Sequence, residues 1–99
     1  MAQIVWTAEA RRWLQEIYDY IAERNEDAAY RTVTGIHQRA EILLQFPEIG
    51  YRYGERPTVR VLLYGHYRIA YQIAPNGDIQ VLGVFHGAMN VRRYLTPPR

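Results

Sequence analysis

Apolar and polar residues alternate along the middle of this chain, in the stretch from residue 58 to residue 86. The alternation is clearest over residues 66–73, and residues 58–64 follow the same period, whereas residues 79–86 are apolar at most positions. A two-residue period places successive side chains on opposite faces of a sheet. The pattern therefore predicts three consecutive strands of an antiparallel meander, over 58–64, 66–73 and 79–86.

The turn between the first two strands contains Gly65, which can adopt the positive φ that tight turns require. We expect a three-residue turn over 64–66, which places Arg60 and Arg68 on one face of the sheet. On the other face this register pairs apolar residues, namely Val59 with Tyr71, Val61 with Ile69 and Leu63 with Tyr67.

The next turn, over residues 74–78, contains an Asn-Gly pair, which is a strong signal for a two-residue hairpin turn. Such a turn pairs Ile73 with the polar Gln80, whereas a five-residue loop pairs Ile73 with Ile79. We expect the five-residue loop, which also places His86 on the same face as Arg68.

Residues before the meander predict one further strand and two helices. Residues 3–6 form a short, largely β-branched run, and Thr7 is placed to cap a helix over 8–24 that has an apolar stripe. Asn25 can end this helix in the left-handed conformation, and a second helix begins at Glu26 and ends before Phe46. The predicted order is β-α-α-β-β-β. This is an α+β fold in which a helical hairpin packs on a four-stranded, mainly antiparallel sheet.

Two segments fall outside this regular pattern. Residues 46–57 contain two Pro, two Gly, two Arg and two Tyr, and irregular segments of this length are often functional. Residues 88–95 are compatible with a short terminal helix, which Pro97 cannot continue.

Composition bounds the class of protein. With 99 residues, 48% of them hydrophobic, we expect a single domain over 1–99. The absence of cysteine excludes disulfides, cysteine metal ligands and a cysteine nucleophile. The histidines at 37, 66 and 86 lack metal-ligand spacing, so we expect neither a metal nor a cofactor. Neither a signal peptide nor an apolar run of membrane-spanning length is apparent, and we expect a cytoplasmic protein without membrane contact.

The net charge is only +2, yet all twelve basic side chains are arginine. Arginine binds phosphate and carboxylate groups bidentately, which suits a polyanion or an acidic protein partner. A GC-rich genome produces the same preference, and both explanations remain open. Nine tyrosines accompany the arginines, and these two residue types commonly anchor protein interfaces.

Several stretches together resemble the RelE/ParE superfamily, the toxins of bacterial type II toxin–antitoxin modules. They cover nearly the whole chain in the family's order: Trp6-Thr7-Ala8-Glu9-Ala10, Ile17-Tyr18-Asp19-Tyr20-Ile21, Phe46-Pro47-Glu48-Ile49-Gly50, Gly65-His66-Tyr67-Arg68-Ile69-Ala70-Tyr71, and Val84-Phe85-His86-Gly87-Ala88-Met89-Asn90. The resemblance implies the fold predicted above. It also implies a cognate antitoxin as partner, and with it a toxin–antitoxin hetero-oligomer.

Two branches of the superfamily imply different targets. RelE-like members are ribosome-dependent mRNA endoribonucleases, and ParE-like members poison DNA gyrase. Arg68 and His86 fall where nucleases carry catalytic residues. However, the strand around Arg60 is apolar where several nucleases have lysines, and the segment from His86 to Leu95 looks more like the ParE branch. We therefore expect a gyrase-directed toxin. A ribosome-dependent nuclease and a non-toxic binding module are the alternatives.

The candidate site residues follow from these two possibilities. RNA cleavage needs a base, a cation and an acid. If the chain is RelE-like, Arg68, His86, Tyr94 and Glu48 are the catalytic candidates. Target or nucleic-acid binding is assigned to Arg52, Arg60, Arg68, Arg92 and Arg93. Each also has a structural interpretation, such as a solvated arginine, a hydrogen-bonded histidine, a carboxylate that caps a turn, or a tyrosine that docks a helix.

Overall fold

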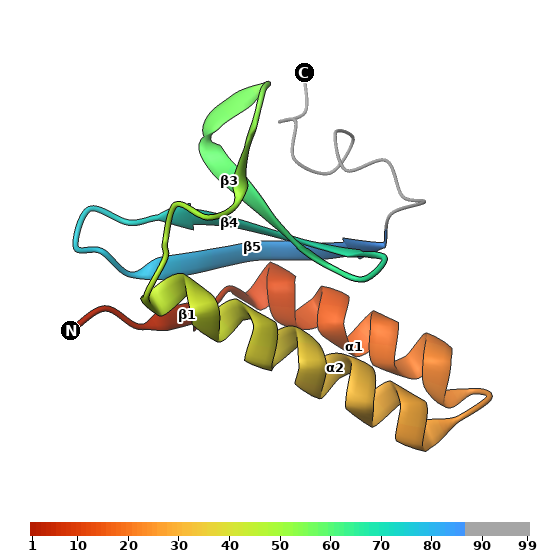
Figure 1. The fold of residues 1–99 in the computed structure, drawn as a ribbon. Coiled ribbons are helices and arrows are strands. Elements are labelled where there is room, and N and C mark those ends of the chain that lie inside the picture. Colours follow the sequence, from red (N-terminus) through yellow and green to blue (C-terminus); the bar gives the residue numbers. More distant parts are fainter. Residues whose placement is uncertain (87–99) are drawn as a thin grey trace.

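The structure, a computed structural model, describes residues 1–86 of the chain (Figure 1). Its elements follow the order β1 (Ile4–Trp6), α1 (Ala8–Ala22), α2 (Glu26–Ala40), the 3₁₀ helix η1 (Glu41–Leu44), β2 (Tyr51–Tyr53), β3 (Arg56–Tyr64), β4 (Tyr67–Ile73) and β5 (Ile79–His86). Both α-helices lie on one face of a single sheet (Figure 1). The helix considered for residues 88–95 lies outside the described residues.

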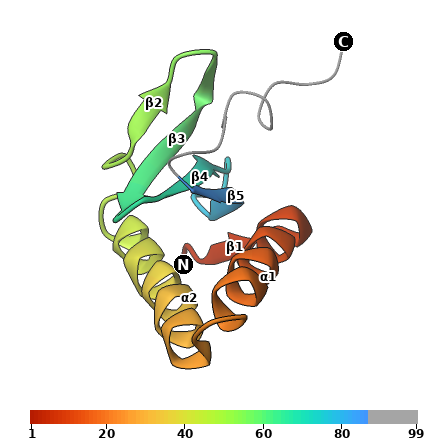
Figure 2. The ribbon, with the colours of Figure 1, turned by 90° about the vertical axis from the view of Figure 1, so that its right-hand side faces the viewer.

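In the described residues the sheet has five strands in the order β1-β5-β4-β3-β2. β1 pairs with β5 in parallel, and the other three pairs are antiparallel. The α+β class and the helical hairpin are confirmed, but the prediction of four strands was wrong. The fifth strand, β2, lies in the segment predicted to be irregular, because three residues are too few to establish a period. It forms an edge with β3 that stands away from the helices (Figure 2).

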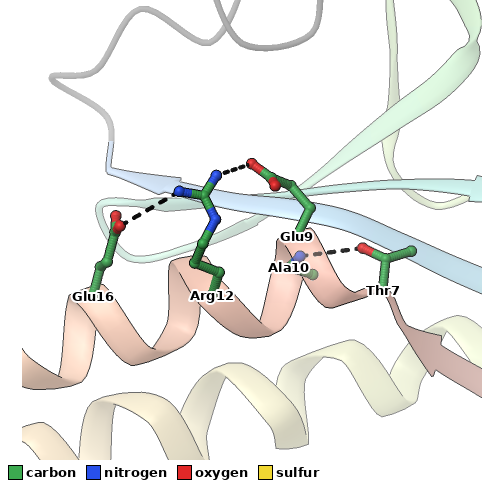
Figure 3. Close-up of polar contacts among 5 residues, drawn as sticks. All are labelled: Thr7, Glu9, Ala10, Arg12 and Glu16. Atoms are coloured by element: carbon green, nitrogen blue, oxygen red, sulfur yellow. Dashed lines mark hydrogen bonds and ion pairs between the residues drawn. The ribbon is translucent and has the colours of Figure 1, made fainter.

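The start of α1 confirms the predicted cap. The hydroxyl of Thr7 accepts a hydrogen bond from the Ala10 amide at 3.1 Å and donates one to the Val81 carbonyl at 2.7 Å. Exposed ion pairs from Arg12 to Glu9 and Glu16 line the next turns (Figure 3). Thr7 thus joins the beginning of α1 to β5, and this positions the helix over the sheet.

The turn between the helices differs from the prediction at Asn25. This residue has an extended backbone, with φ −157°, and its side chain accepts a hydrogen bond from the Ala28 amide at 2.9 Å. Asn25 therefore caps the beginning of α2 and does not end α1, which stops two residues earlier than predicted, at Ala22. The predicted second helix divides into α2 and η1.

The register between β3 and β4 corrects the predicted one by a single residue. Tyr64 pairs with Tyr67, so the turn contains two residues, and Gly65 adopts the expected positive φ of +56°. Because the side-chain period is two, the shorter turn moves every residue of β3 to the opposite face. Arg60 now lies opposite Tyr71, on the helix-covered face, and Arg68 points to the other face. Their predicted sharing of a face was wrong.

The loop between β4 and β5 has five residues, as predicted, and pairs Ile73 with Ile79. A β-bulge follows, because Tyr71 pairs with Val81 whereas Ala70 pairs with Gly83. Because of the extra residue, each side chain in the second half of β5 points to the opposite face from the one that strict alternation predicts. His86 therefore lies opposite Tyr67, and the predicted sharing of a face by His86 and Arg68 was wrong.

The apolar pattern allowed the wrong register because both sheet faces bury apolar residues. On the helix side Leu62 and Ile69 pack with Leu14 of α1 and Ile36 of α2. The other face, called the outer face below, has its own buried strand residues, Val59, Ala70 and Phe85, and Trp13 of α1 belongs to the same cluster through its contact with Phe85. Within the described residues no helix is long and apolar enough to cross a membrane.

Candidate functional site

The side chain of Arg60 is bound to the segment that precedes β2. Its Nη1 donates hydrogen bonds to the carbonyl oxygens of Glu48, at 3.0 Å, and Gly50, at 2.9 Å. Two backbone carbonyls thus bind one guanidinium nitrogen, and these hydrogen bonds fix the guanidinium group of Arg60 against the segment before β2. The residue that sequence reasoning assigned to target binding also has a structural role.

Tyr71 of β4 also binds this segment, through its hydroxyl group. Its hydroxyl donates to the Pro47 carbonyl at 2.7 Å and accepts from the Gly50 amide at 3.0 Å. The side chain is fully buried, and this burial raises the pKa of Tyr71, although the Gly50 hydrogen bond and the charge of Arg60 oppose the shift. The phenol is therefore neutral near pH 7, as its role as a donor requires. We call residues 45–50 the anchored loop.

Gly50 is required at the point where Tyr71 approaches the backbone. A Cβ there would lie 2.7 Å from the Tyr71 hydroxyl and 2.8 Å from the Val61 carbonyl oxygen. Sequence reasoning missed this contact. The available signal was a tyrosine at an inward-facing position of a central strand, since a buried phenol needs a hydrogen-bond partner.

The anchored loop exposes apolar side chains to solvent. Phe46 is 56% exposed and Ile49 is 50% exposed. Residues Gln45 to Ile49 line a shallow hollow of about 410 Å³. Glu48, a catalytic candidate, is also exposed on this loop, and its backbone carbonyl accepts the hydrogen bond from Arg60.

Arg52 of β2 lies directly opposite Arg60 of β3, so the two side chains share one face of the sheet. Arg52 is exposed. Among the described residues no ion pair joins a carboxylate to either arginine. The two candidates are therefore brought together on one face of the sheet.

Arg68 lies on the outer face, between Leu63 of β3 and Phe85 of β5. Leu63 is 50% exposed, and Tyr51, which lies opposite Val61 on the same face, is 48% exposed. Tyr51, Leu63 and Arg68 form what we call the outer patch. It combines one aromatic, one aliphatic and one cationic side chain at the surface.

His86 lies at the end of β5, on the helix side. Its ring is 5.5 Å from that of Tyr67 and 6.0 Å from that of His66, measured between centroids. Together with side chains of α1, including Ile17 and Tyr20, His86 lines an apolar groove of about 410 Å³. Burial also raises the pKa of Tyr67.

The candidates in the described residues therefore occupy three separate places. Glu48, Arg52 and Arg60 lie at the β2 end of the sheet, Arg68 lies on the outer face, and His86 lies beside α1. Tyr94, Arg92 and Arg93 lie outside the described residues. Among residues 1–86, no group of three or more His, Asp or Glu side chains is placed to hold a metal ion.

Comparison with known proteins identifies the family. Residues 4–91 match the model of the ParE toxin of the type II toxin–antitoxin system parDE. The protein Y4kP of Sinorhizobium fredii is 36% identical over 86 residues, which cover 85% of this chain and 86% of that protein. Toxin RelE2 of Caulobacter vibrioides is 32% identical over 88 residues, which cover 89% of this chain and 98% of the toxin.

Solved structures agree on the fold. A chain of the chromosomal ParDE toxin–antitoxin system from P. aeruginosa superposes with a TM-score of 0.74 at 26% identity, covering 87% of this chain and 96% of that one. A chain of the RelBE2 toxin–antitoxin complex from Mycobacterium tuberculosis gives 0.68 at 21% identity, with coverages of 86% and 96%. This chain therefore belongs to the ParE toxin family of type II toxin–antitoxin systems, within the RelE/ParE superfamily.

Proposed function

We propose that this protein is a toxin that inhibits bacterial DNA gyrase, acts in the cytoplasm and is neutralised by a cognate antitoxin. The observation that carries the proposal is the match of the ParE toxin model to residues 4–91. Gyrase is the target that the resemblance to the ParE branch implies.

The separation of the candidate residues favours a binding role over RNA cleavage. A ribonuclease needs its base, cation and acid around one phosphate. Arg60 is bound to two loop carbonyls, Arg68 points to the opposite face, and His86 lies at a third place. This arrangement suits a toxin that acts through contact surfaces.

The outer patch is our choice for the target-contact surface. Tyrosine and arginine supply much of the binding energy in protein interfaces, and Tyr51, Leu63 and Arg68 present both types beside an exposed aliphatic side chain. Arg92 and Arg93 remain proposed contacts, since they follow β5 in the chain.

We also propose that the protein forms a hetero-oligomer with an antitoxin. Both of the similar solved structures come from toxin–antitoxin systems. An antitoxin that binds only the folded toxin raises the melting temperature as its concentration increases. A titration with the co-expressed antitoxin measures this directly, and a flat titration would contradict the partnership.

A second candidate function is a ribosome-dependent mRNA endoribonuclease. It is favoured by the 32% identity to toxin RelE2 of Caulobacter vibrioides. In that case Arg68, His86, Tyr94 and Glu48 are the catalytic candidates, and replacing a general acid or base such as His86 with Gln slows RNA cleavage by about two orders of magnitude or more.

One experiment separates the two candidates. Radiolabelled thymidine and amino-acid incorporation is followed in the minutes after the toxin is induced in a bacterial host. For a gyrase inhibitor we expect DNA synthesis to fail first and chromosomes to break. Immediate loss of protein synthesis, with DNA synthesis continuing, would instead support the nuclease.

A second experiment tests the contact surface with purified components. Gyrase supercoiling is measured with the wild-type toxin, with Arg68→Ala and with Arg31→Ala, which removes an exposed arginine of α2 as a control. We expect Arg68→Ala alone to lose inhibition while the circular dichroism spectrum stays native. Full inhibition by Arg68→Ala would exclude the outer patch.

A further inference from the structure

A groove lies between the two α-helices, on the helix side of the molecule. Figure 2 shows α1 and α2 close together at the turn that connects them and apart at their other ends, where β1 lies between them. The groove has a volume of about 600 Å³, and its lining comes from α1, from α2 and from Trp6 at the end of β1. Small-molecule sites commonly have volumes of about 300–1,000 Å³, and some lie between helices. The groove therefore has the size and the position of a small-molecule site.

The buried part of the lining is apolar and aromatic. Leu14 of α1 is buried, and Val33 of α2 is half-buried. The half-buried ring of Trp6 lies 4.4 Å from the ring of His37, measured between centroids, at an interplanar angle of 51°. Aromatic rings favour offset or edge contacts with a further ring. These surfaces suit a planar aromatic group.

The charged part of the lining is Arg11. None of the described residues that line the groove is acidic. The residues three or four positions from Arg11 on α1 are Thr7, Ala8, Leu14 and Gln15, so its neighbours on the helix surface carry no carboxylate. Arginine binds a carboxylate through parallel N–H donors. The charge of the groove is therefore complementary to an anion.

The next residue, Arg12, has different surroundings. It forms ion pairs with Glu9 and Glu16, and it is not among the described residues that line the groove (Figure 3). Two consecutive exposed arginines of one helix thus differ in position, since only Arg11 lies where a molecule in the groove can contact it. Arg12 is consequently a matched control for Arg11.

Tyr18 lines the groove further along α1. Its hydroxyl donates a hydrogen bond to the Glu26 carboxylate at 3.4 Å, so this part of the groove lies near a negative charge. An anionic group is therefore favoured near Arg11 and disfavoured near Tyr18. The two residues are seven positions apart, which corresponds to about 10 Å along the helix. This length suits a molecule of two fused aromatic rings with one acidic group.

We propose that this groove, the interhelical groove, binds a small planar aromatic carboxylate. The carboxylate binds the guanidinium of Arg11, and the rings pack against Trp6, Leu14 and Val33. A neutral aromatic compound of the same shape makes only the ring contacts, so it binds more weakly. The inference goes beyond the proposed function, because the groove lies on the helix side and the outer patch lies on the other face of the sheet.

Naphthoate, a two-ring aromatic carboxylate, is the probe that tests this proposal. The chain contains two tryptophans, so two indole N–H signals report on binding in heteronuclear NMR spectra. Trp6 lines the groove, whereas Trp13 contacts Phe85 and is not among the described lining residues. We expect the Trp6 signal to shift and saturate with a dissociation constant of about 1 mM or lower, while the Trp13 signal stays in place. No shift at Trp6, or equal shifts of both signals, would overturn the proposal.

Two comparisons test the contact with Arg11. Naphthamide keeps the rings but lacks the charge, and we expect it to bind at least tenfold more weakly than naphthoate. Arg11→Gln should weaken naphthoate binding at least tenfold, whereas Arg12→Gln should keep the wild-type affinity. Equal binding of the two probes, or equal effects of the two substitutions, would refute the anion site. The titration uses neither gyrase nor an antitoxin, so its failure leaves the proposed toxin activity standing, and failure of that activity leaves this result standing.

Discussion

Arg60 and Arg68 belong to neighbouring strands of one sheet, yet their surroundings differ. Arg60 points to the helix-covered face, where the carbonyls of Glu48 and Gly50 bind it. Arg68 points to the outer face, between the exposed Leu63 and the buried Phe85. The difference teaches that an arginine's role depends on which acceptors the strand register brings within reach. We expect mutations in the Arg60 region to lower the stability of the fold. Mutations in the Arg68 region should instead lower the activity of the protein.

The largest effect on the Arg60 region is expected from Gly50→Ala. The added methyl group would lie within 2.8 Å of Tyr71 and of the Val61 carbonyl, so the anchored loop must move and its hydrogen bonds are lost. We expect a loss of about 3 kcal/mol in the free energy of unfolding, measured by urea denaturation. Gly54→Ala is the control, since nothing lies within 4 Å of its Cβ position. Equal losses for the two variants would refute the close packing at Gly50.

Tyr71→Phe should have the next largest effect. It keeps the ring but removes the hydroxyl, which leaves the Pro47 carbonyl and the Gly50 amide without their partner. We expect a loss of about 2 kcal/mol, which lowers the melting temperature by about 8–16 °C for a domain of this size. Tyr20→Phe, at a residue that is 78% exposed, should leave the melting temperature unchanged. A Tyr71→Phe variant as stable as the wild type would mean that the hydroxyl does not hold the loop.

Substituting each arginine separately tests the comparison directly. Arg60→Ala should cost about 1 kcal/mol, because a partly buried, charged donor of two hydrogen bonds is lost. Arg68→Ala should change stability by less than about 0.5 kcal/mol, yet reduce growth inhibition strongly. Thermal melts and plating assays on both variants measure the two quantities. The reverse outcome, with a destabilised Arg68→Ala and a stable Arg60→Ala, would invalidate the division between the regions.

The smallest expected effect is a dependence of stability on alkaline pH. Burial raises the pKa of Tyr71 above its ordinary value of 10.0, so the unfolded chain loses this proton at lower pH than the folded protein. The stabilisation is complete below about pH 10 and decreases as the pH rises further. Urea denaturation between pH 9 and pH 11 should show a shallower decline for Tyr71→Phe than for the wild type. If the stability of Tyr71→Phe and of the wild type fell equally over this pH range, the pH dependence would come from groups other than Tyr71.

Much of the fold could be predicted from the sequence because strong local signals agree. Thr7 has a side chain suited to an N-cap, Gly65 accepts a positive φ, and the pairing of Ile73 with Ile79 follows from matching two apolar residues. Asn25 was ambiguous, since asparagine suits both the end and the beginning of a helix. In the structure Asn25 adopts the extended backbone of an N-cap, because its side chain accepts a hydrogen bond from the Ala28 amide at the start of α2.

The arrangement of the candidate site could not be predicted, because two single-residue irregularities control it. A two-residue turn at Gly65 separates Arg60 from Arg68, and the bulge after Val81 separates His86 from Arg68. Both sheet faces bury apolar side chains, so hydrophobic burial cannot detect either shift. The anchored loop depends on a tertiary contact between Tyr71 and Gly50, which no local pattern encodes.

The parallel pairing of β1 with β5 has a consequence for protein synthesis. Thr7, which caps α1, bonds to Val81, a residue 74 positions further along the chain. On the ribosome, β1 and both helices are made well before the strand that completes their packing. Long-range contacts of this kind delay folding until late in synthesis. A nascent chain that ends before β5 therefore lacks the completed sheet and its surfaces. Those surfaces form in the producing cell only when translation of the domain is nearly complete.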